Sequence, residues 1–188
     1  MREVELKAIV DDLAERRKII EAAGATLSFE GKISDRRYDF PSRELTSRDE
    51  VLRTRRYLSQ APTRIYLDWK GATETRDVYK TREELTTSVE DQLALETILE
   101  KIGLELTWEI DRDIAQYQFR GATIRFETYP RMDVLVEVEG DPAAIEEAIS
   151  ALGMPRGIFT NERLADFVTS FERRTGVRAA VSESELSQ

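Results

Sequence analysis

The stretch EVELK, close to the N-terminus, places Glu3, Glu5 and Lys7 two residues apart. Side chains at this spacing share one face of a β-strand. Clustered carboxylates bind a hard divalent cation, and a lysine ammonium binds phosphate or carboxylate. The stretch therefore indicates metal and phosphate chemistry, although a single strand of this kind is also typical of the solvent-facing side of an ordinary sheet.

The same spacing of charges recurs in both halves of the chain. The further pairs are Arg53 and Arg55, Asp68 and Lys70, Arg125 and Glu127, and Glu137 and Glu139. The opposite face of each strand is mostly apolar, so helices can cover it while the charged faces turn towards one another in a closed sheet. Because buried charges are costly unless they are paired or bound, we infer a ligand that satisfies carboxylates and arginines together, a metal-bound polyphosphate.

Period-two alternation predicts the strands that must position these groups. We expect strands over residues 2–10, 26–40, 51–58, 64–82, 105–115, 116–121, 123–129 and 133–139, with a turn at Gly71 that folds 64–82 into a hairpin. Helices are expected over 13–23, from Ser88 to 102, over 142–152, and around 164–171. The polar tail from Val177 is expected to be disordered.

Composition narrows the classes of function. The 188 residues fit one domain, and they include no cysteine and no histidine. This excludes the usual zinc ligands and every Ser-His or Cys-His arrangement, so a metal must be held by oxygen. The net charge of −9 argues against non-specific binding to nucleic acid or to an anionic membrane. With no signal peptide and no stretch that could span a bilayer, we expect a cytoplasmic protein.

Six short stretches carry a resemblance to a known family. They are EVELK, RRYDFP, LRTR, WKG, TREEL and VEVEG, and they extend over nearly the whole chain. Their order and spacing resemble those of the CYTH superfamily, the triphosphate tunnel metalloenzymes, which includes class IV adenylyl cyclases, thiamine triphosphatases and inorganic triphosphatases. No single stretch is specific, and it is the ordered set that identifies the chain as a member.

The resemblance implies an α+β fold, a closed eight-stranded antiparallel barrel with helices packed outside and two pseudo-symmetric halves. It implies one tunnel domain over residues 1–176, followed by a tail over 177–188. The implied ligands of Mg²⁺ or Mn²⁺ are Glu3, Glu5, Glu127, Glu137 and Glu139. The implied substrate-binding residues are Lys7, Arg53, Arg55, Lys70, Arg82, Arg112 and Arg125.

Three functions are compatible with these residues. The leading hypothesis is metal-dependent hydrolysis of the triphosphate of a nucleotide, of thiamine triphosphate or of inorganic tripolyphosphate. The alternatives are an adenylyl cyclase that makes cyclic AMP and pyrophosphate, and a non-catalytic polyphosphate or nucleotide binder. The expected partner is a small-molecule triphosphate, and a homodimer is left open. Lys7 is the candidate for proton transfer, because neighbouring cations would lower the pKa of its ammonium.

Some residues depart from the family pattern or favour a structural interpretation. Ile114 stands where the family carries a second basic residue, Thr86 interrupts an acidic repeat, and Glu127 replaces an aspartate. Ile114 and Glu127 motivate the binder alternative. Asp39 is interpreted as structural, and Trp108 as a core residue that could also stack on an organic head group at the tunnel mouth.

Overall fold

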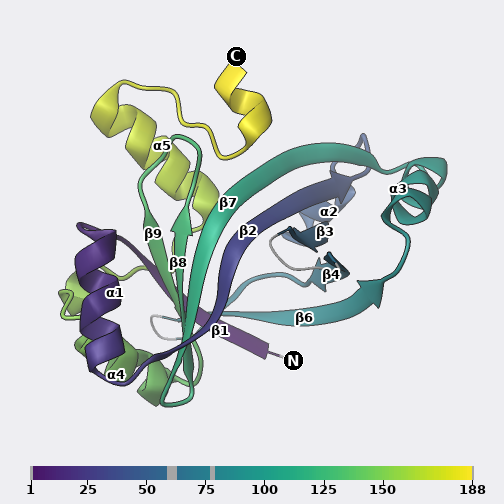
Figure 1. The fold of residues 1–188 in the computed structure, drawn as a ribbon. Helices are drawn as coiled ribbons and strands as arrows, with labels where there is room; N and C mark the ends of the chain where they lie inside the picture. The colour runs from purple at the N-terminus through teal and green to yellow at the C-terminus, as the bar shows by residue number, and fades with distance from the viewer. Residues whose placement is uncertain (1, 59–62, 77–78, 188) are drawn as a thin grey trace.

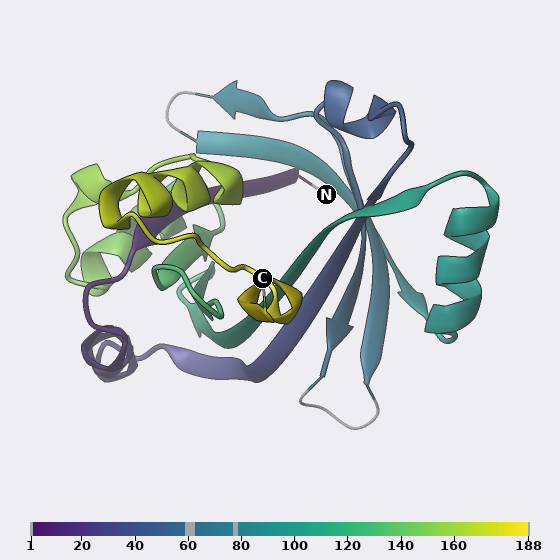
Figure 2. The same ribbon diagram turned by 90° about the horizontal axis from the view of Figure 1, so that it is seen from above.

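The strands of the chain close into a ring. The computed structural model describes residues 2–58, 63–76 and 79–187. Within these ranges, eight antiparallel strands form a closed barrel with five α-helices outside it or at its ends (Figure 1). Seen from above, the ring lies between α3 on one side and α1, α4 and α5 on the other (Figure 2). The predicted α+β fold and closed eight-stranded barrel are confirmed.

Neighbouring strands follow the ring order β1-β9-β8-β7-β2-β3-β4-β6, and β6 pairs with β1 to close it. The ring strands are β1 (Arg2–Ile9), β2 (Thr26–Asp39), β3 (Val51–Tyr57), β4 (Arg64–Lys70), β6 (Tyr79–Val89), β7 (Glu105–Phe119), β8 (Ala122–Thr128) and β9 (Leu135–Glu139). A short strand, β5 (Glu74–Arg76), pairs with β6 outside the ring.

The two halves of the chain repeat one order of elements. Each half has a strand, a helix and then a three-stranded meander: β1, α1 (Leu13–Ala22) and β2-β3-β4, followed by β6, α3 (Gln92–Lys101) and β7-β8-β9. Exchanging the halves leaves the order of strands around the ring unchanged. The predicted pseudo-symmetry is therefore present in the topology.

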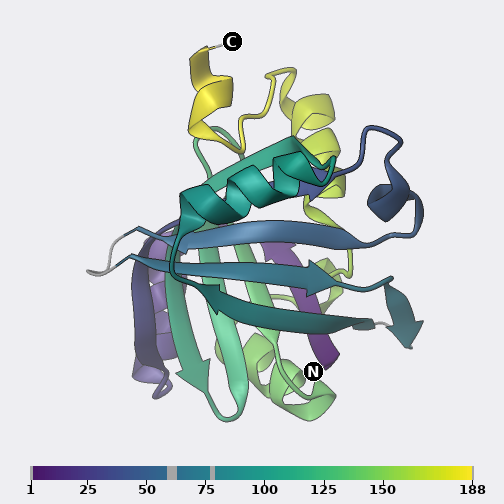
Figure 3. The same ribbon diagram turned by 90° about the vertical axis from the view of Figure 1, so that its right-hand side faces the viewer.

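The outward faces of the strands form the main apolar core. Leu6 and Ala8 on β1 are buried outside the ring against Ile20 of α1 and Ile149 of α4 (Pro142–Ala151). Alternate residues of a strand point to opposite faces, so burying Leu6 and Ala8 outside directs Glu5 and Lys7 into the ring. A separate apolar cluster packs α3 against the outer surface of the barrel near β2 and β3. Figure 3 shows α3 lying across this surface.

Two element boundaries differ from the prediction, and one short helix was not predicted. Residues 105–119 form the single strand β7 instead of two, because Gln116 continues the ladder opposite Arg125 of β8. Strand β6 runs through Val89, so α3 is capped by Asp91, which accepts a hydrogen bond from the backbone N–H of Ala94, and not by Ser88. A short helix that was not predicted, α2 (Glu44–Ser47), follows β2.

Asp39 organises this short helix. Its carboxylate accepts hydrogen bonds from the backbone N–H groups of Leu45 and Thr46, both at 2.9 Å, and from the Thr46 hydroxyl at 2.7 Å. Asp39 is itself buried. These contacts agree with the structural interpretation of Asp39.

The C-terminal segment is ordered, which differs from the disorder expected from Val177. Ala180 pairs with Arg131, and the Val181 carbonyl accepts a hydrogen bond from the Asp111 N–H at 2.8 Å. Val181 is buried in a cluster with Phe167 of α5 (Leu164–Thr175). The tail is polar on average, but residues 179–181 are apolar and buried, and their burial favours an ordered segment.

Two further 3₁₀ turns complete the described chain, η1 (Arg156–Ile158) and η2 (Glu183–Ser187). Among the described residues, no helix is both long enough and apolar enough to cross a bilayer.

Candidate functional site

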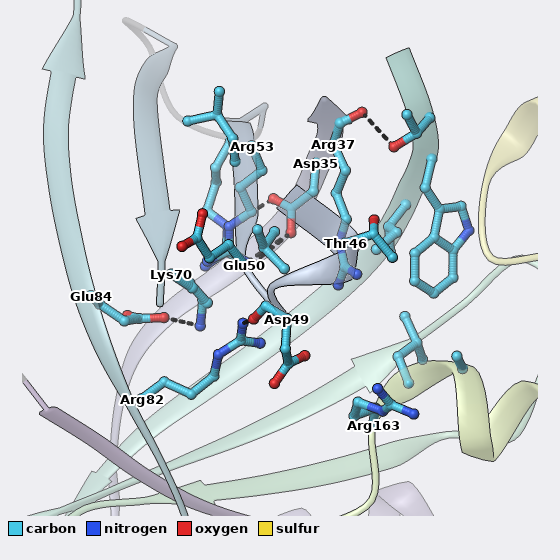
Figure 4. A pocket seen from close by; sticks show the side chains of 18 of the residues that line it. Asp35, Arg37, Thr46, Asp49, Glu50, Arg53, Lys70, Arg82, Glu84 and Arg163 are labelled. Atoms are coloured by element: carbon cyan, nitrogen blue, oxygen red, sulfur yellow. Dashed lines mark hydrogen bonds and ion pairs between the residues drawn. The ribbon is translucent and has the colours of Figure 1, made fainter. Parts of the chain in front are cut away.

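The inward faces of the ring enclose a cavity of about 810 Å³. Side chains from all eight ring strands line it, together with residues around α2 and at the start of α5. Figure 4 shows part of this lining, where Arg53, Lys70 and Arg82 point into the cavity. Ten of the lining side chains are basic and nine are acidic. Although the whole chain carries a net charge of −9, this ring cavity is thus densely and almost evenly charged.

Nearly all of the predicted site residues meet in this cavity. Those that line it are Glu5, Lys7, Arg53, Arg55, Lys70, Arg82, Arg112, Arg125, Glu127, Glu137 and Glu139. For Glu3 only the backbone is described, opposite Arg82 in the β1–β6 ladder. The predicted role of its side chain lies outside the described residues.

One wall of the ring cavity carries the carboxylates. Glu5 on β1 lies opposite Glu139 on β9 in the strand register, and Lys7 lies opposite Glu137. The Lys7 ammonium is 2.9 Å from the Glu5 carboxylate and 2.6 Å from that of Glu137, which also pairs with Arg125 at 2.6 Å. Burial alone would raise the pKa of Glu137, but Lys7 and Arg125 hold it well below the usual range, so this carboxylate is ionised at neutral pH.

The oxygen donors on this wall suit a hard divalent cation in their chemistry. Glu5, Glu137 and Glu139 are carboxylates on neighbouring strands and on one face, which is the donor type that Mg²⁺ and Mn²⁺ prefer. Among the described residues, no three acidic side chains are already gathered around one point. These three glutamates fit a divalent metal ion by donor type and by their closeness on neighbouring strands. In this structure the Lys7 ammonium neutralises part of their negative charge.

Lys7 does not have the lowered pKa that the sequence analysis expected. Burial lowers the pKa of its ammonium, but the carboxylates of Glu137, Glu5 and Glu127 raise it well above the ordinary value. The expectation was wrong because it considered only the cations of the motifs, whereas the Lys7 ammonium lies between Glu5 of its own strand and Glu137, its register partner on β9. Lys7 is a charged ammonium in this structure, and its role in proton transfer stays a prediction without support from the pKa.

The opposite wall carries a buried ionic cluster centred on Asp35, which the sequence analysis did not single out. The Arg55 guanidinium donates to both carboxylate oxygens of Asp35, each at 2.8 Å. Arg112 donates to the same carboxylate at 3.1 Å and Arg53 at 3.4 Å. Asp35 is only 1% exposed. We call Asp35, Arg53, Arg55 and Arg112 the Asp35 cluster, which holds three guanidiniums together beside the ring cavity.

This cluster predicts a specific loss of stability in acid. Burial alone would raise the pKa of Asp35, but Arg55, Arg112 and Arg53 hold it well below the usual range. The folded state therefore binds this proton less readily than the unfolded state, whose aspartate titrates near about 3.9. The stability from Asp35 is present above that pH and is lost as the pH falls below it.

Urea unfolding of the wild type and of Asp35→Asn across pH 7 to 2 measures this effect. We expect the difference in unfolding free energy between the two proteins to shrink as the pH falls below about 4. A difference that stays constant down to pH 2 would contradict the predicted ionisation of Asp35.

Other predicted residues are held by specific partners. Glu127 accepts hydrogen bonds from Arg112 at 3.0 Å and from the Tyr129 hydroxyl at 2.5 Å, so it orients an arginine of the Asp35 cluster. Its role as a metal ligand stays a prediction. Lys70 pairs with Glu84, and Arg82 donates to the carbonyl of Gly71 at 2.7 Å, at the end of β4.

The ring cavity has two different ends. Beyond the Asp35 cluster, Phe29, Ile33, Tyr57 and Ile114 form an apolar cluster, which we call the apolar end. None of these four residues lines the cavity. At the other end, the mouth, exposed residues near α2 and Arg163 beside α5 line the cavity. Ile114, where the resemblance led us to expect a second basic residue, is buried in the apolar end.

Trp108 lies towards the mouth and is only partly buried. It lines the ring cavity and packs against the apolar cluster beneath α5. The guanidinium carbon of Arg37 lies 4.6 Å from the centre of its ring. One partner of the indole is therefore a cation from the neighbouring strand β2.

The model of the CYTH domain family matches residues 1–148 of the chain. Similar solved structures include a proposed adenylate cyclase from Vibrio parahaemolyticus, at 18% identity and TM-score 0.74 over 89% of this chain and 97% of that one. PH1012 protein from Pyrococcus horikoshii OT3 matches at 16% identity and TM-score 0.73, over 88% and 98%. HpAC1 from Hippeastrum, a proposed adenylyl cyclase with a dominant triphosphatase activity, matches at 15% and 0.66, over 89% and 96%. No curated protein matches in sequence.

Proposed function

Since the chain belongs to the CYTH domain family, we propose that it is a metal-dependent enzyme that cleaves small-molecule triphosphates inside its ring of strands. The CYTH superfamily is one of metal-dependent proteins that bind triphosphates in a tunnel. The observation that carries the proposal is the pairing of two walls in one cavity. Glutamates gather on β1 and β9, and the guanidiniums of the Asp35 cluster face the same cavity.

The basic residues would bind and orient the phosphate chain. Arg53, Arg55 and Arg112 are largely buried and fixed by hydrogen bonds, so they lose little freedom when they donate to phosphate oxygens. Lys7 and Arg125 add charge from the glutamate wall. Phosphoryl transfer needs mainly such positioning and charge neutralisation, which this set of residues supplies.

Glu5, Glu137 and Glu139 would hold Mg²⁺ or Mn²⁺. A bound divalent ion polarises phosphoryl oxygens and neutralises the charge that develops in the reaction. In hydrolysis, the oxygen of a water molecule bonds to a terminal phosphorus, the bond from that phosphorus to its bridging oxygen breaks, and the water proton is released to solvent or to a base. The products are phosphate and a diphosphate.

The mouth of the ring cavity favours hydrolysis over cyclisation in this proposal. A cyclase must also hold a nucleoside so that its ribose 3′-hydroxyl attacks, whereas a triphosphatase needs only the phosphate chain and water. The mouth is lined by charged residues such as Arg43, Asp49, Glu50 and Arg163. We therefore place the triphosphatase first, with the adenylyl cyclase as the alternative.

A substrate panel tests the proposal. Purified protein is incubated with tripolyphosphate, ATP or thiamine triphosphate plus Mg²⁺ or Mn²⁺, and phosphate, pyrophosphate and cyclic AMP are assayed. We expect metal-dependent release of phosphate. Cyclic AMP with pyrophosphate from ATP would replace this proposal by the cyclase, and binding of all three without any product would replace it by a non-catalytic binder.

A further inference from the structure

Arg37 is an inward-facing arginine that no family motif of this chain assigns to the substrate. It lies on β2, directly opposite Arg53 of β3 and Trp108 of β7 in the strand register. Its side chain lines the ring cavity and reaches into it from the β2 wall (Figure 4). Arg37 thus belongs to the same charged surface as the Asp35 cluster.

Arg37 differs from its neighbours in that it forms no ion pair with a carboxylate of the described residues. Arg53 pairs with Asp68 at 2.8 Å, Arg55 with Asp35 at 2.8 Å, and Arg125 with Glu137 at 2.6 Å. The buried Nε atom of Arg37, in contrast, has no hydrogen-bond partner among the described residues. A buried donor without a partner is destabilising, so a group at this position that accepts its hydrogen bond would be stabilising.

The surroundings of Arg37 favour an anion as that group. Burial, and next the charge of Arg53, lower the pKa of Arg37 to about 10, against a weaker opposing effect of Asp35. The guanidinium stays protonated at neutral pH, yet its neighbourhood is positive. Trp108 holds it in place from one side, 4.6 Å from the ring centre. A guanidinium that is held in place and whose Nε has no partner among the described residues is suited to a phosphate oxygen.

The position of Arg37 along the strand says which phosphate it would meet. Asp35 lies at the level of Ile110, and Arg37 lies two residues further towards the mouth, at the level of Trp108. Two strand residues span about 6.6 Å, the length scale of a chain of three phosphates. Because the apolar end lies behind the Asp35 cluster and contributes no residue to the cavity lining, a chain that enters through the mouth would end at that cluster and extend back to Arg37.

From this geometry we infer that Arg37 is a substrate-binding residue that donates to the phosphate nearest the mouth, so that the site selects linear chains of at least three phosphates over diphosphate. The inference rests on the proposed function. It adds Arg37 as a specificity residue, which lies in the RRYDFP stretch but is not among the substrate-binding residues that the resemblance implies. Trp108 then acts as the support of Arg37, and its contact with an organic head group is secondary.

Binding of tripolyphosphate and of diphosphate without metal, measured by titration calorimetry, tests the inference apart from turnover. We expect Arg37→Met to weaken tripolyphosphate binding by about 10-fold or more, the effect of losing a charge-assisted hydrogen bond, and diphosphate binding by less than about 3-fold. Arg37→Lys should lie in between. The matched control is Arg120→Met, because Arg120 is exposed, is not among the residues that line the ring cavity and pairs with Glu147 at 3.5 Å; this variant should bind tripolyphosphate as the wild type does.

Thermal unfolding separates a binding role from a structural one. Removing a partly buried charge whose Nε has no hydrogen-bond partner among the described residues should leave the melting temperature of ligand-free Arg37→Met unchanged or higher, while the increase caused by tripolyphosphate becomes smaller than in the wild type. Wild-type affinity for tripolyphosphate in Arg37→Met, or a lower melting temperature with no loss of affinity, would overturn the inference alone. A wild-type protein that binds no polyphosphate would overturn the proposed function as well.

Discussion

Glu5→Gln is expected to lower the rate of phosphate release from tripolyphosphate by at least about 100-fold while the protein stays folded. Glu5 supplies one of the three carboxylates on the wall formed by β1 and β9, and an amide oxygen binds a divalent cation far less strongly than a carboxylate. The side chain keeps its size. The substitution removes one negative charge opposite Glu139, and although Lys7 loses its contact with the Glu5 carboxylate it keeps its ion pair with Glu137, so the barrel is expected to stay folded.

The rate is measured at saturating Mg²⁺ and again at saturating Mn²⁺, with the melting temperature as the test of folding. Glu30→Gln is the matched control, because Glu30 is an exposed glutamate on β2 that pairs with Arg17 outside the cavity. This control should retain wild-type activity. Full activity of Glu5→Gln with either metal would contradict the assignment of the glutamate wall.

Asp35→Asn is expected to lower the free energy of unfolding by about 3–5 kcal/mol, and tripolyphosphate should restore much of that loss. The substitution leaves three largely buried guanidiniums, those of Arg53, Arg55 and Arg112, without their shared carboxylate. A bound polyphosphate would neutralise the same guanidiniums. The increase in stability on adding tripolyphosphate should therefore be larger for Asp35→Asn than for the wild type.

Urea unfolding with and without tripolyphosphate measures both effects. Asp11→Asn is the control, since Asp11 pairs with Arg16 at the surface and should show a much smaller loss. If Asp35→Asn proved as stable as the wild type, the Asp35 cluster would not be the buried ionic centre described above. If tripolyphosphate stabilised both proteins equally, the guanidiniums of this cluster would not be its binding site.

The sequence predicted the glutamate wall better than the arginine wall, and the reason is physical. On β1 the inward residues Glu5 and Lys7 are charged and the outward ones are apolar, so period two reveals the face directly. On β2 the inward face changes along the strand, from Phe29 and Ile33 in the apolar end to charged residues beyond. No simple alternation marks such a face, so Asp35 and Arg37 were missed.

The register between β2 and β3 would have identified both Asp35 and Arg37. Once β2 is placed beside β3, the alternation of Arg53 and Arg55 requires inward partners at Arg37 and Asp35. The pairing of distant strands cannot be derived from one sequence by periodicity alone, because it depends on how the ring closes. The same dependence explains the error on the pKa of Lys7, whose partner Glu137 is remote in sequence.

The most direct test of the central claim, a metal-bound triphosphate inside the ring, is a crystal structure of the protein with Mn²⁺ and a non-hydrolysable imido analogue of tripolyphosphate. We predict an anomalous manganese signal beside Glu5, Glu137 and Glu139, with the phosphate chain contacting Arg53, Arg55 and Arg112. An analogue bound only outside the ring cavity, or a manganese ion held by none of these glutamates, would contradict the account.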